Sequence, residues 1–166
     1  MRKNINRGYM KLIVWQEARE LYVLSCRILR GLPYELRRVV SNQIASVDSI
    51  HRNVAEGYCR RTLNEYLQHL NIALGSAGES VSAMHVYRTA DQIAEAPFEE
   101  WDALAFKLEN GLVRLIESLQ QKRLEGGWQD SFVLRESNEA YGSADTSPSE
   151  ASLPTFQHSS IPSFPE

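Results

Sequence analysis

The sequence has few cysteines and prolines and lacks a long apolar run. Only Cys26 and Cys59 occur, with no C-x-x-C spacing, which disfavours a disulfide framework and a zinc site. We expect both to be reduced and half-buried. After the basic start, the apolar run Leu12-Ile13-Val14-Trp15 is too short for a signal peptide or a membrane helix. The sequence therefore predicts a cytoplasmic protein that does not span a membrane.

Proline is concentrated near the C-terminus. Only Pro33 and Pro97 precede residue 126, and apolar residues recur every three or four positions around them. No segment alternates with period two for long enough to form a strand. We predict an all-α fold, an antiparallel up-down-up-down four-helix bundle, with helices over residues 11–30, 34–57, 62–90 and 98–124.

Local signals predict the helix ends and the core. Gly57 is placed as a C-cap, and Thr62 and Glu65 have the spacing of a capping box. His51 is expected to face the core, hydrogen-bonded there to Gln43. The apolar stripes predict core positions at Trp15, Leu70, Leu74, Leu108, Leu112 and Leu115.

The segment 62–90 carries a second apolar surface behind its core stripe. A helix that is apolar on both sides usually has neighbours on both sides. Small residues from Gly75 to Gly78 would allow another backbone to approach closely. We therefore expect a homo-oligomer whose interface includes Ile72, Gly75, Glu79 and Val86.

The composition changes after Gly126-Gly127. Residues 126–166 hold nine Ser and four Pro with few aliphatic residues, too little apolar surface to offset the entropy of ordering. We predict a bundle domain over 9–125 and a disordered, acidic, Ser/Pro-rich tail over 126–166. The segments 154–156 and 162–165 have the form of short docking motifs, but we favour a passive tail.

Charge is distributed unevenly. Residues 1–61 have twelve Lys/Arg against five Asp/Glu (+7), and 62–125 have five against ten (−5). The basic half could complement the acidic half within or between subunits, or attract nucleic acid. The candidate phosphate-binding residues are Arg37, Arg38, Arg52, Arg60 and Arg61. The alternative, which we favour, is that they pair with Glu56, Glu65 and Glu79.

Residues suited to catalysis are sparse. Glu65 and His69 are four apart and are expected to face away from the core, and there is no second such pair to complete a metal site. His51 and His85 are interpreted as hydrogen-bonded structural residues rather than catalytic ones. No phosphate-binding loop, nucleophile elbow or zinc-protease motif occurs. We predict no enzyme activity, no cofactor and no metal.

Three segments resemble a known family. They are Val14-Trp15-Gln16, the run Asn53-Val54-Ala55-Glu56-Gly57-Tyr58-Cys59-Arg60-Arg61, and Ile72-Ala73-Leu74-Gly75-Ser76 followed by Glu79. Together they resemble the four-helix-bundle proteins of intervening sequences in bacterial 23S rRNA genes, over residues 9–124. Relatives often have a proline just before the Asn-Ala-Glu-Gly segment, where this chain has Ile50-His51-Arg52, so a straighter second helix is expected.

The resemblance implies ring-forming homo-oligomers, typically pentamers, with no established enzymatic activity. A distant branch of the family supports the reverse transcriptase of diversity-generating retroelements as a basic accessory protein. The predicted function is a non-catalytic oligomeric scaffold that contacts RNA or a nucleoprotein partner. The alternatives are a protein-binding bundle without nucleic acid and an accessory subunit of a retroelement reverse transcriptase.

Overall fold

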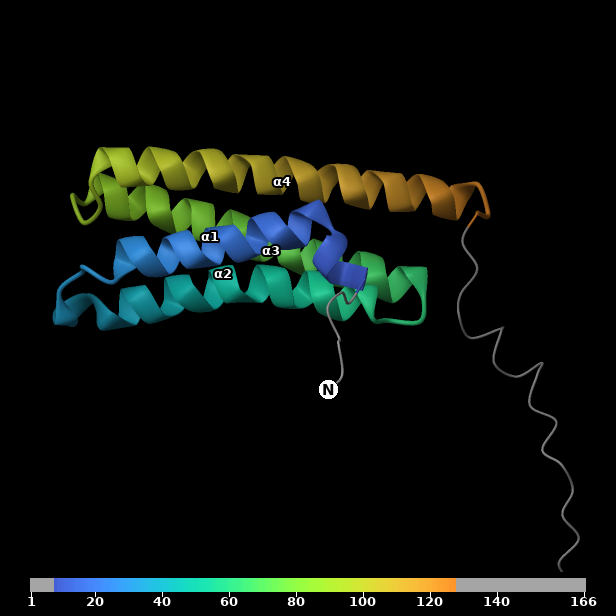
Figure 1. Cartoon of the computed structure of the whole chain (residues 1–166), viewed down its shortest axis with the longest axis horizontal. Coiled ribbons are helices and arrows are strands. Elements are labelled where there is room, and N and C mark those ends of the chain that lie inside the picture. The colour runs from blue at the N-terminus through green and yellow to red at the C-terminus, as the bar shows by residue number, and fades with distance from the viewer. Residues whose placement is uncertain (1–7, 128–166) are drawn as a thin grey trace, which may run out of the picture.

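The structure is a computed structural model that describes residues 8–127. Four α-helices lie side by side and run alternately in opposite directions (Figure 1). Each helix packs against the next, and the first also packs against the last, which closes the bundle. This confirms the predicted all-α, up-down-up-down bundle. The elements are η1 (Gly8–Lys11), α1 (Ile13–Leu29), η2 (Tyr34–Leu36), α2 (Arg37–Tyr58), α3 (Leu63–Thr89) and α4 (Glu95–Leu124).

The helix ends differ from the prediction at two of the punctuating residues. Pro97 was expected to precede the fourth helix, but it lies in the first turn of α4. Proline is tolerated there because the amides of the first turn have no partner within the helix. Gly57 is not a C-cap: it lies inside α2, and Cys59 caps the helix. The Thr62–Glu65 capping box is confirmed.

The core runs the length of the bundle. Leu70, Leu108 and Leu112 are completely buried, as predicted. Trp15, Leu74 and Leu115 are only half-buried against this core, because each lies at the edge of its helix's apolar stripe.

Two polar contacts join α1 to α4 across this core. The indole nitrogen of Trp101 donates to the Ser25 hydroxyl at 2.7 Å, and that hydroxyl donates to the Leu21 carbonyl at 2.8 Å. The buried Glu17 carboxylate meets the ammonium of Lys107 at 3.0 Å. Because buried polar groups without partners are costly, these contacts fix how α1 and α4 face each other.

The structure tests the predictions for the cysteines and for membrane-spanning helices, but not the prediction for the tail. From residue 128 onward, the predicted tail over 126–166 lies outside the described residues. Within the described part, both cysteines are free; Cys26 is half-buried as expected, but Cys59 is exposed at the end of α2. None of the described helices combines the length and the apolar character needed to cross a membrane.

Replacing Leu112 with alanine should lower the free energy of unfolding by about 2–5 kcal/mol, because it leaves a cavity in a fully packed core. Urea denaturation followed by circular dichroism measures the change. Val113→Ala, at the neighbouring exposed position, is the matched control and should change stability by less than about 0.5 kcal/mol. Equal effects of the two substitutions would contradict the assigned core face.

Candidate functional site

Gly57 allows α2 and α3 to approach each other closely. A Cβ atom at this position would lie 2.8 Å from the Cβ of His69 and 2.9 Å from Cδ2 of Tyr66. Contacts that short do not occur between real side chains, so only glycine fits without moving α3. The glycine in the Asn53–Arg61 segment is therefore explained by helix packing rather than by helix termination.

The capping box fixes where α3 begins next to this contact. The Thr62 hydroxyl accepts from the Glu65 amide at 3.2 Å, and the Glu65 carboxylate accepts from the Thr62 hydroxyl at 2.8 Å and from its amide at 3.3 Å. These hydrogen bonds hold the pKa of Glu65 below its ordinary value. Tyr66 is the next residue of α3 after Glu65, and burial raises the pKa of its phenol to about 12.

A continuous chain of hydrogen bonds crosses from α2 to α3 beside Gly57. The guanidinium Nε of Arg60 donates to Nε2 of His69 at 3.2 Å. Because Arg60 can only donate, Nε2 accepts, and Nδ1 is the nitrogen that donates to Oδ1 of Asn53 at 3.1 Å. The Asn53 amide then donates to Oγ of Ser49 at 3.1 Å, which lies 2.9 Å from Oγ of Ser76.

This chain corrects the sequence-based view of His69, which was expected to face away from the core. His69 instead lies in the α2–α3 interface, with 16% of its side chain exposed. Two segments that carried the family resemblance contribute to this hydrogen-bond chain, Asn53–Arg61 through Asn53 and Arg60, and Ile72–Glu79 through Ser76. Apolar residues that recur every three or four positions show which side of a helix is apolar. They do not show whether a polar side chain beside that apolar side contacts another helix, so the contact of His69 with Asn53 and Arg60 was not predicted.

The five candidate phosphate-binding arginines are not brought into one cluster. Arg37 and Arg38 lie at the first turn of α2, whereas Arg60 and Arg61 follow its end. The 22 residues of α2 separate them by about 33 Å at 1.5 Å per residue. Arg52 lies between the two pairs.

The arginines also differ in their partners. Arg60 binds Glu56 as well as His69, which is the kind of pairing favoured from the sequence. Arg52 meets Asp48 at 3.2 Å, a partner that was not predicted. Arg37 stacks on the Tyr34 ring, 4.4 Å from its centroid. Arg38 and Arg61 are exposed.

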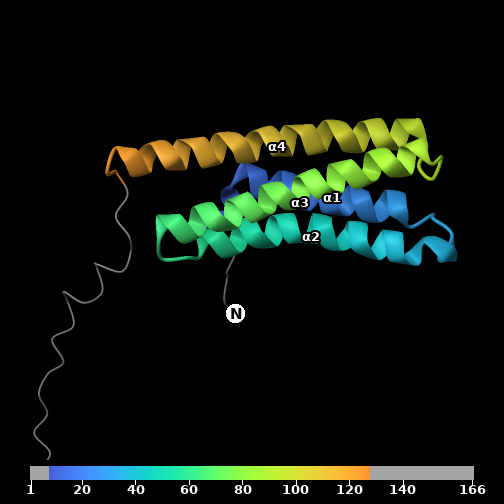
Figure 2. The same ribbon diagram turned by 180° about the vertical axis from the view of Figure 1, so that it is seen from behind.

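The predicted interface residues lie together on the outward side of α3. Ile72 is 45% exposed and Val86 is 60% exposed, with Gly75 and Glu79 exposed between them. Their spacings of three, four and seven residues place all four on one helix face. Figure 2 shows α3 from the side where it lies in front of α1.

The remaining candidate histidines have structural partners. His51 is half-buried and meets Asp48 at 3.1 Å, not Gln43 as expected, and its ring contacts Tyr22 edge to face. Gln43 is buried and donates to the Ser80 carbonyl instead. His85 is exposed and meets Asp102 at 3.2 Å. Among the described residues, no group of three or more His, Cys, Asp and Glu is arranged to hold a metal ion.

The sequence of the bundle matches a known family. The sequence profile described as "23S rRNA-intervening sequence protein" matches residues 10–114, which span α1 to most of α4. The chain belongs to this family. The matched range includes Asn53–Arg61 and Ile72–Glu79, so the residues of the α2–α3 contact lie within it.

A solved structure has a similar fold. It is a protein of unknown function from the S23 ribosomal protein family of Bacteroides thetaiotaomicron, with a TM-score of 0.59 and 20% sequence identity. The similarity covers 63% of this chain and 96% of that chain. At this identity the likeness concerns the fold alone. No curated protein matches the sequence.

Replacing Gly57 with alanine should destabilise the protein by about 1–3 kcal/mol, because the added methyl overpacks the contact with His69 and Tyr66. Chemical denaturation measures the loss. Asn42→Ala, at an exposed position of the same helix, is the control and should stay within about 0.5 kcal/mol of wild type. A Gly57→Ala protein as stable as the control would show that α2 and α3 do not need to approach this closely.

Proposed function

We propose that this protein is a non-catalytic scaffold that assembles into a closed homo-oligomer through the outward face of α3 and contacts RNA or a nucleoprotein partner. The observation that carries the proposal is the environment of the glycines in α3. A Cβ atom at Gly75 or at Gly78 would have nothing within 4 Å. Neither glycine therefore makes room for another part of the chain within residues 8–127.

Gly75 and Gly78 lower the stability of α3, and no contact among the described residues of the single chain compensates for this. Glycine inside a helix destabilises it by roughly 0.5–1 kcal/mol relative to alanine. Elsewhere in the bundle, glycines inside helices have close neighbours: a Cβ at Gly57 would clash with α3, and one at Gly111 would lie 3.0 Å from Val14. The open surroundings of Gly75 and Gly78 support a partner helix that approaches α3 from outside the chain.

The properties of the rest of this face fit a second copy. Ile72 and Val86 are exposed apolar residues on either side of the glycines. The helices α1 and α2 belong to the basic part of the sequence and α3 and α4 to the acidic part. A contact between the basic helices of one subunit and α3 of the next is heterologous, and such contacts close into a ring when the rotation permits. Five subunits is the number that the family resemblance implies.

The hydrogen-bond chain between α2 and α3 supports a structural role rather than catalysis. His69 has both ring nitrogens engaged by Asn53 and Arg60. Asn53 and Ser49 likewise bond to each other. Side chains that satisfy one another across a helix interface hold the two helices in register, which a scaffold requires.

Introducing a charge on the α3 face should dissociate the assembly without unfolding the bundle. We expect Ile72→Glu or Val86→Glu to reduce the mass measured by light scattering to that of one chain, 18.9 kDa, at micromolar concentration. Helix content should be unchanged, since both side chains are exposed. Leu124→Glu, at the exposed end of α4, is the control and should remain assembled. A wild-type protein with a monomeric mass would contradict the proposed scaffold.

Contact with RNA is the second part of the proposal, and Arg60 and Arg61 support it as adjacent basic residues at one end of α2. Replacing both with alanine should weaken binding to an RNA oligonucleotide and lower the slope of log affinity against log salt by roughly 1.4 if both contact phosphates of a single strand. The control is Arg19→Ala with Arg114→Ala, which removes the same charge elsewhere. Fluorescence anisotropy at several salt concentrations measures both.

The same titration tests the alternatives. If wild type shows no salt-sensitive RNA binding at low ionic strength while the assembly persists, the protein-binding scaffold without nucleic acid replaces the RNA-contacting one. A role as accessory subunit of a retroelement reverse transcriptase requires in addition that the assembly bind that enzyme. Its encoding gene would then lie beside a reverse transcriptase gene.

A further inference from the structure

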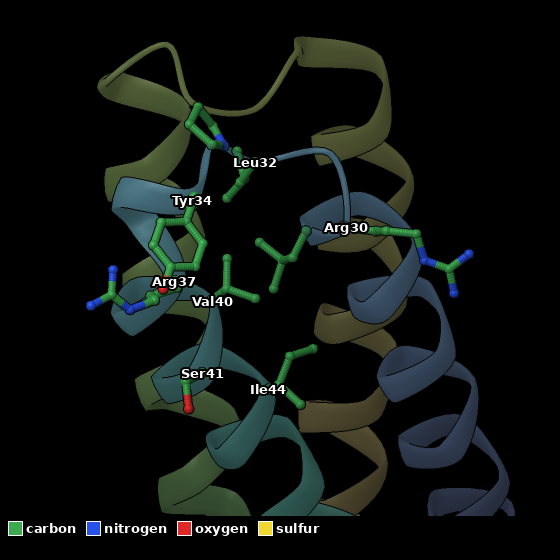
Figure 3. Close-up of a pocket in the computed structure, with 9 residues that line it drawn as sticks. Arg30, Leu32, Tyr34, Arg37, Val40, Ser41 and Ile44 are labelled. Atoms are coloured by element: carbon green, nitrogen blue, oxygen red, sulfur yellow. The ribbon is translucent and has the colours of Figure 1, made fainter.

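An apolar groove lies at the end of the bundle where α1 connects to α2 (Figure 3). It encloses about 440 Å³, and its floor consists of the aliphatic residues Leu29, Leu32, Val40 and Ile44. Figure 3 shows the side chains of Leu32, Val40 and Ile44 directed into the space between the two helices. This groove is separate from the outward face of α3 and from the Arg60–Ser76 hydrogen-bond chain.

The rim of the groove is aromatic and basic. Tyr34 is 74% exposed, and the Arg37 guanidinium stacks on its ring. Arg30 lines the opposite side, and Figure 3 shows the two guanidinium groups extending outward on either side of the floor. Among the described residues that line the groove, none is acidic. The groove is thus suited to an extended apolar segment that carries negative charge.

The chain itself contains a segment of this chemistry. Residues 128–166 lie outside the described part and carry six Asp/Glu against one Lys/Arg, and two of these acidic residues, Glu150 and Glu166, flank the apolar motifs near the C-terminus. Near their end, the sequence Leu-Pro-Thr-Phe, residues 153–156, and the sequence Ile-Pro-Ser-Phe-Pro, residues 161–165, combine proline with aliphatic and aromatic residues. Proline favours the extended conformation that aromatic-lined grooves bind at low entropic cost.

The reach of the chain permits this contact. The described chain leaves α4 at the end of the bundle opposite to the groove (Figure 1). The 30 residues of α4 span about 45 Å at 1.5 Å per residue. The 29 residues from Trp128 to Phe156 extend to about 100 Å at most, which exceeds that distance. Covalent attachment also raises the local concentration of the segment, so a weak site can be occupied.

A neighbouring hollow on the other side of Leu32 is less suitable. It is lined by Leu24, Ile28 and Pro97, but Glu100 lies on its wall together with Arg27. A carboxylate at that position would repel an acidic segment. The distribution of charge therefore favours the groove between Arg30 and Arg37.

We propose that the groove between α1 and α2 is the docking site for the C-terminal segment 150–166 of the same chain, with Phe156 on its aliphatic floor and the flanking carboxylates of Glu150 and Glu166 beside Arg30 and Arg37. This replaces the passive tail favoured from composition. The proposal depends on neither RNA binding nor the assembly through α3. It assigns the tail an intramolecular partner.

Photo-crosslinking of the full-length protein tests the proposal. Replacing Phe156 with p-benzoylphenylalanine and irradiating should give adducts within the tryptic peptides 31–37 and 39–52, which contain Tyr34, Val40 and Ile44. Arg37→Glu and Tyr34→Ala, both at exposed positions, should each lower the adduct yield at least about fivefold. Arg114→Glu, an exposed arginine on α4, is the matched control and should leave the yield unchanged.

A mixture of unlabelled and ¹⁵N-labelled protein shows whether the adducts form within one chain. Adducts that join the Phe156 position to the groove of the same isotope label, without mixed-label adducts, support the proposal. Adducts on other surfaces, an equimolar mixture in which about half of the adducts join differently labelled chains, or a yield unaffected by both Arg37→Glu and Tyr34→Ala would each overturn it. Circular dichroism of both variants establishes that the bundle remains folded.

Discussion

The close approach of α2 to α3 at Gly57 determines the polar arrangement of this bundle. Because a side chain at position 57 would collide with His69 and Tyr66, the two helices meet at a distance that only glycine permits. That distance brings the His69 ring between Asn53 and Arg60, and the hydrogen-bond chain to Ser76 follows from it. The capping box at Thr62 then starts α3 at a position that keeps this register.

The helix α3 has two roles, one on each side. Its inward side places Leu70, Ala73 and Met84 in the core, whereas its outward side exposes Ile72, Gly75 and Val86. Glycines in α2 and α3 lie at the contact with α2 on one side of α3 and at the proposed contact on the other. Gly57 makes room for a contact within the chain, while Gly75 and Gly78 have open space around them, which is the basis of the proposed assembly.

The two ends of the bundle have different chemistry, although arginines lie at or next to both ends of α2. At one end Arg60 is held by Glu56 and His69, so its charge is partly neutralised and its geometry is fixed. At the other end Arg30 and Arg37 border an apolar groove, and no acidic residue of the described chain lines it. Arg60 thus takes part in the contact between α2 and α3, whereas Arg30 and Arg37 border the proposed docking groove.

The sequence by itself determined the number, order and approximate ends of the helices and the innermost core, because apolar periodicity and capping chemistry are local properties of the chain. The Thr62 capping box and the burial of Leu108 and Leu112 are examples. Only the tertiary structure decided the role of Gly57, the partners of His69 and His51, and the separation of Arg37 from Arg60. The physical reason is that these depend on how closely two helices approach and on which residues of a second helix face them, and neither is encoded in the spacing along one helix.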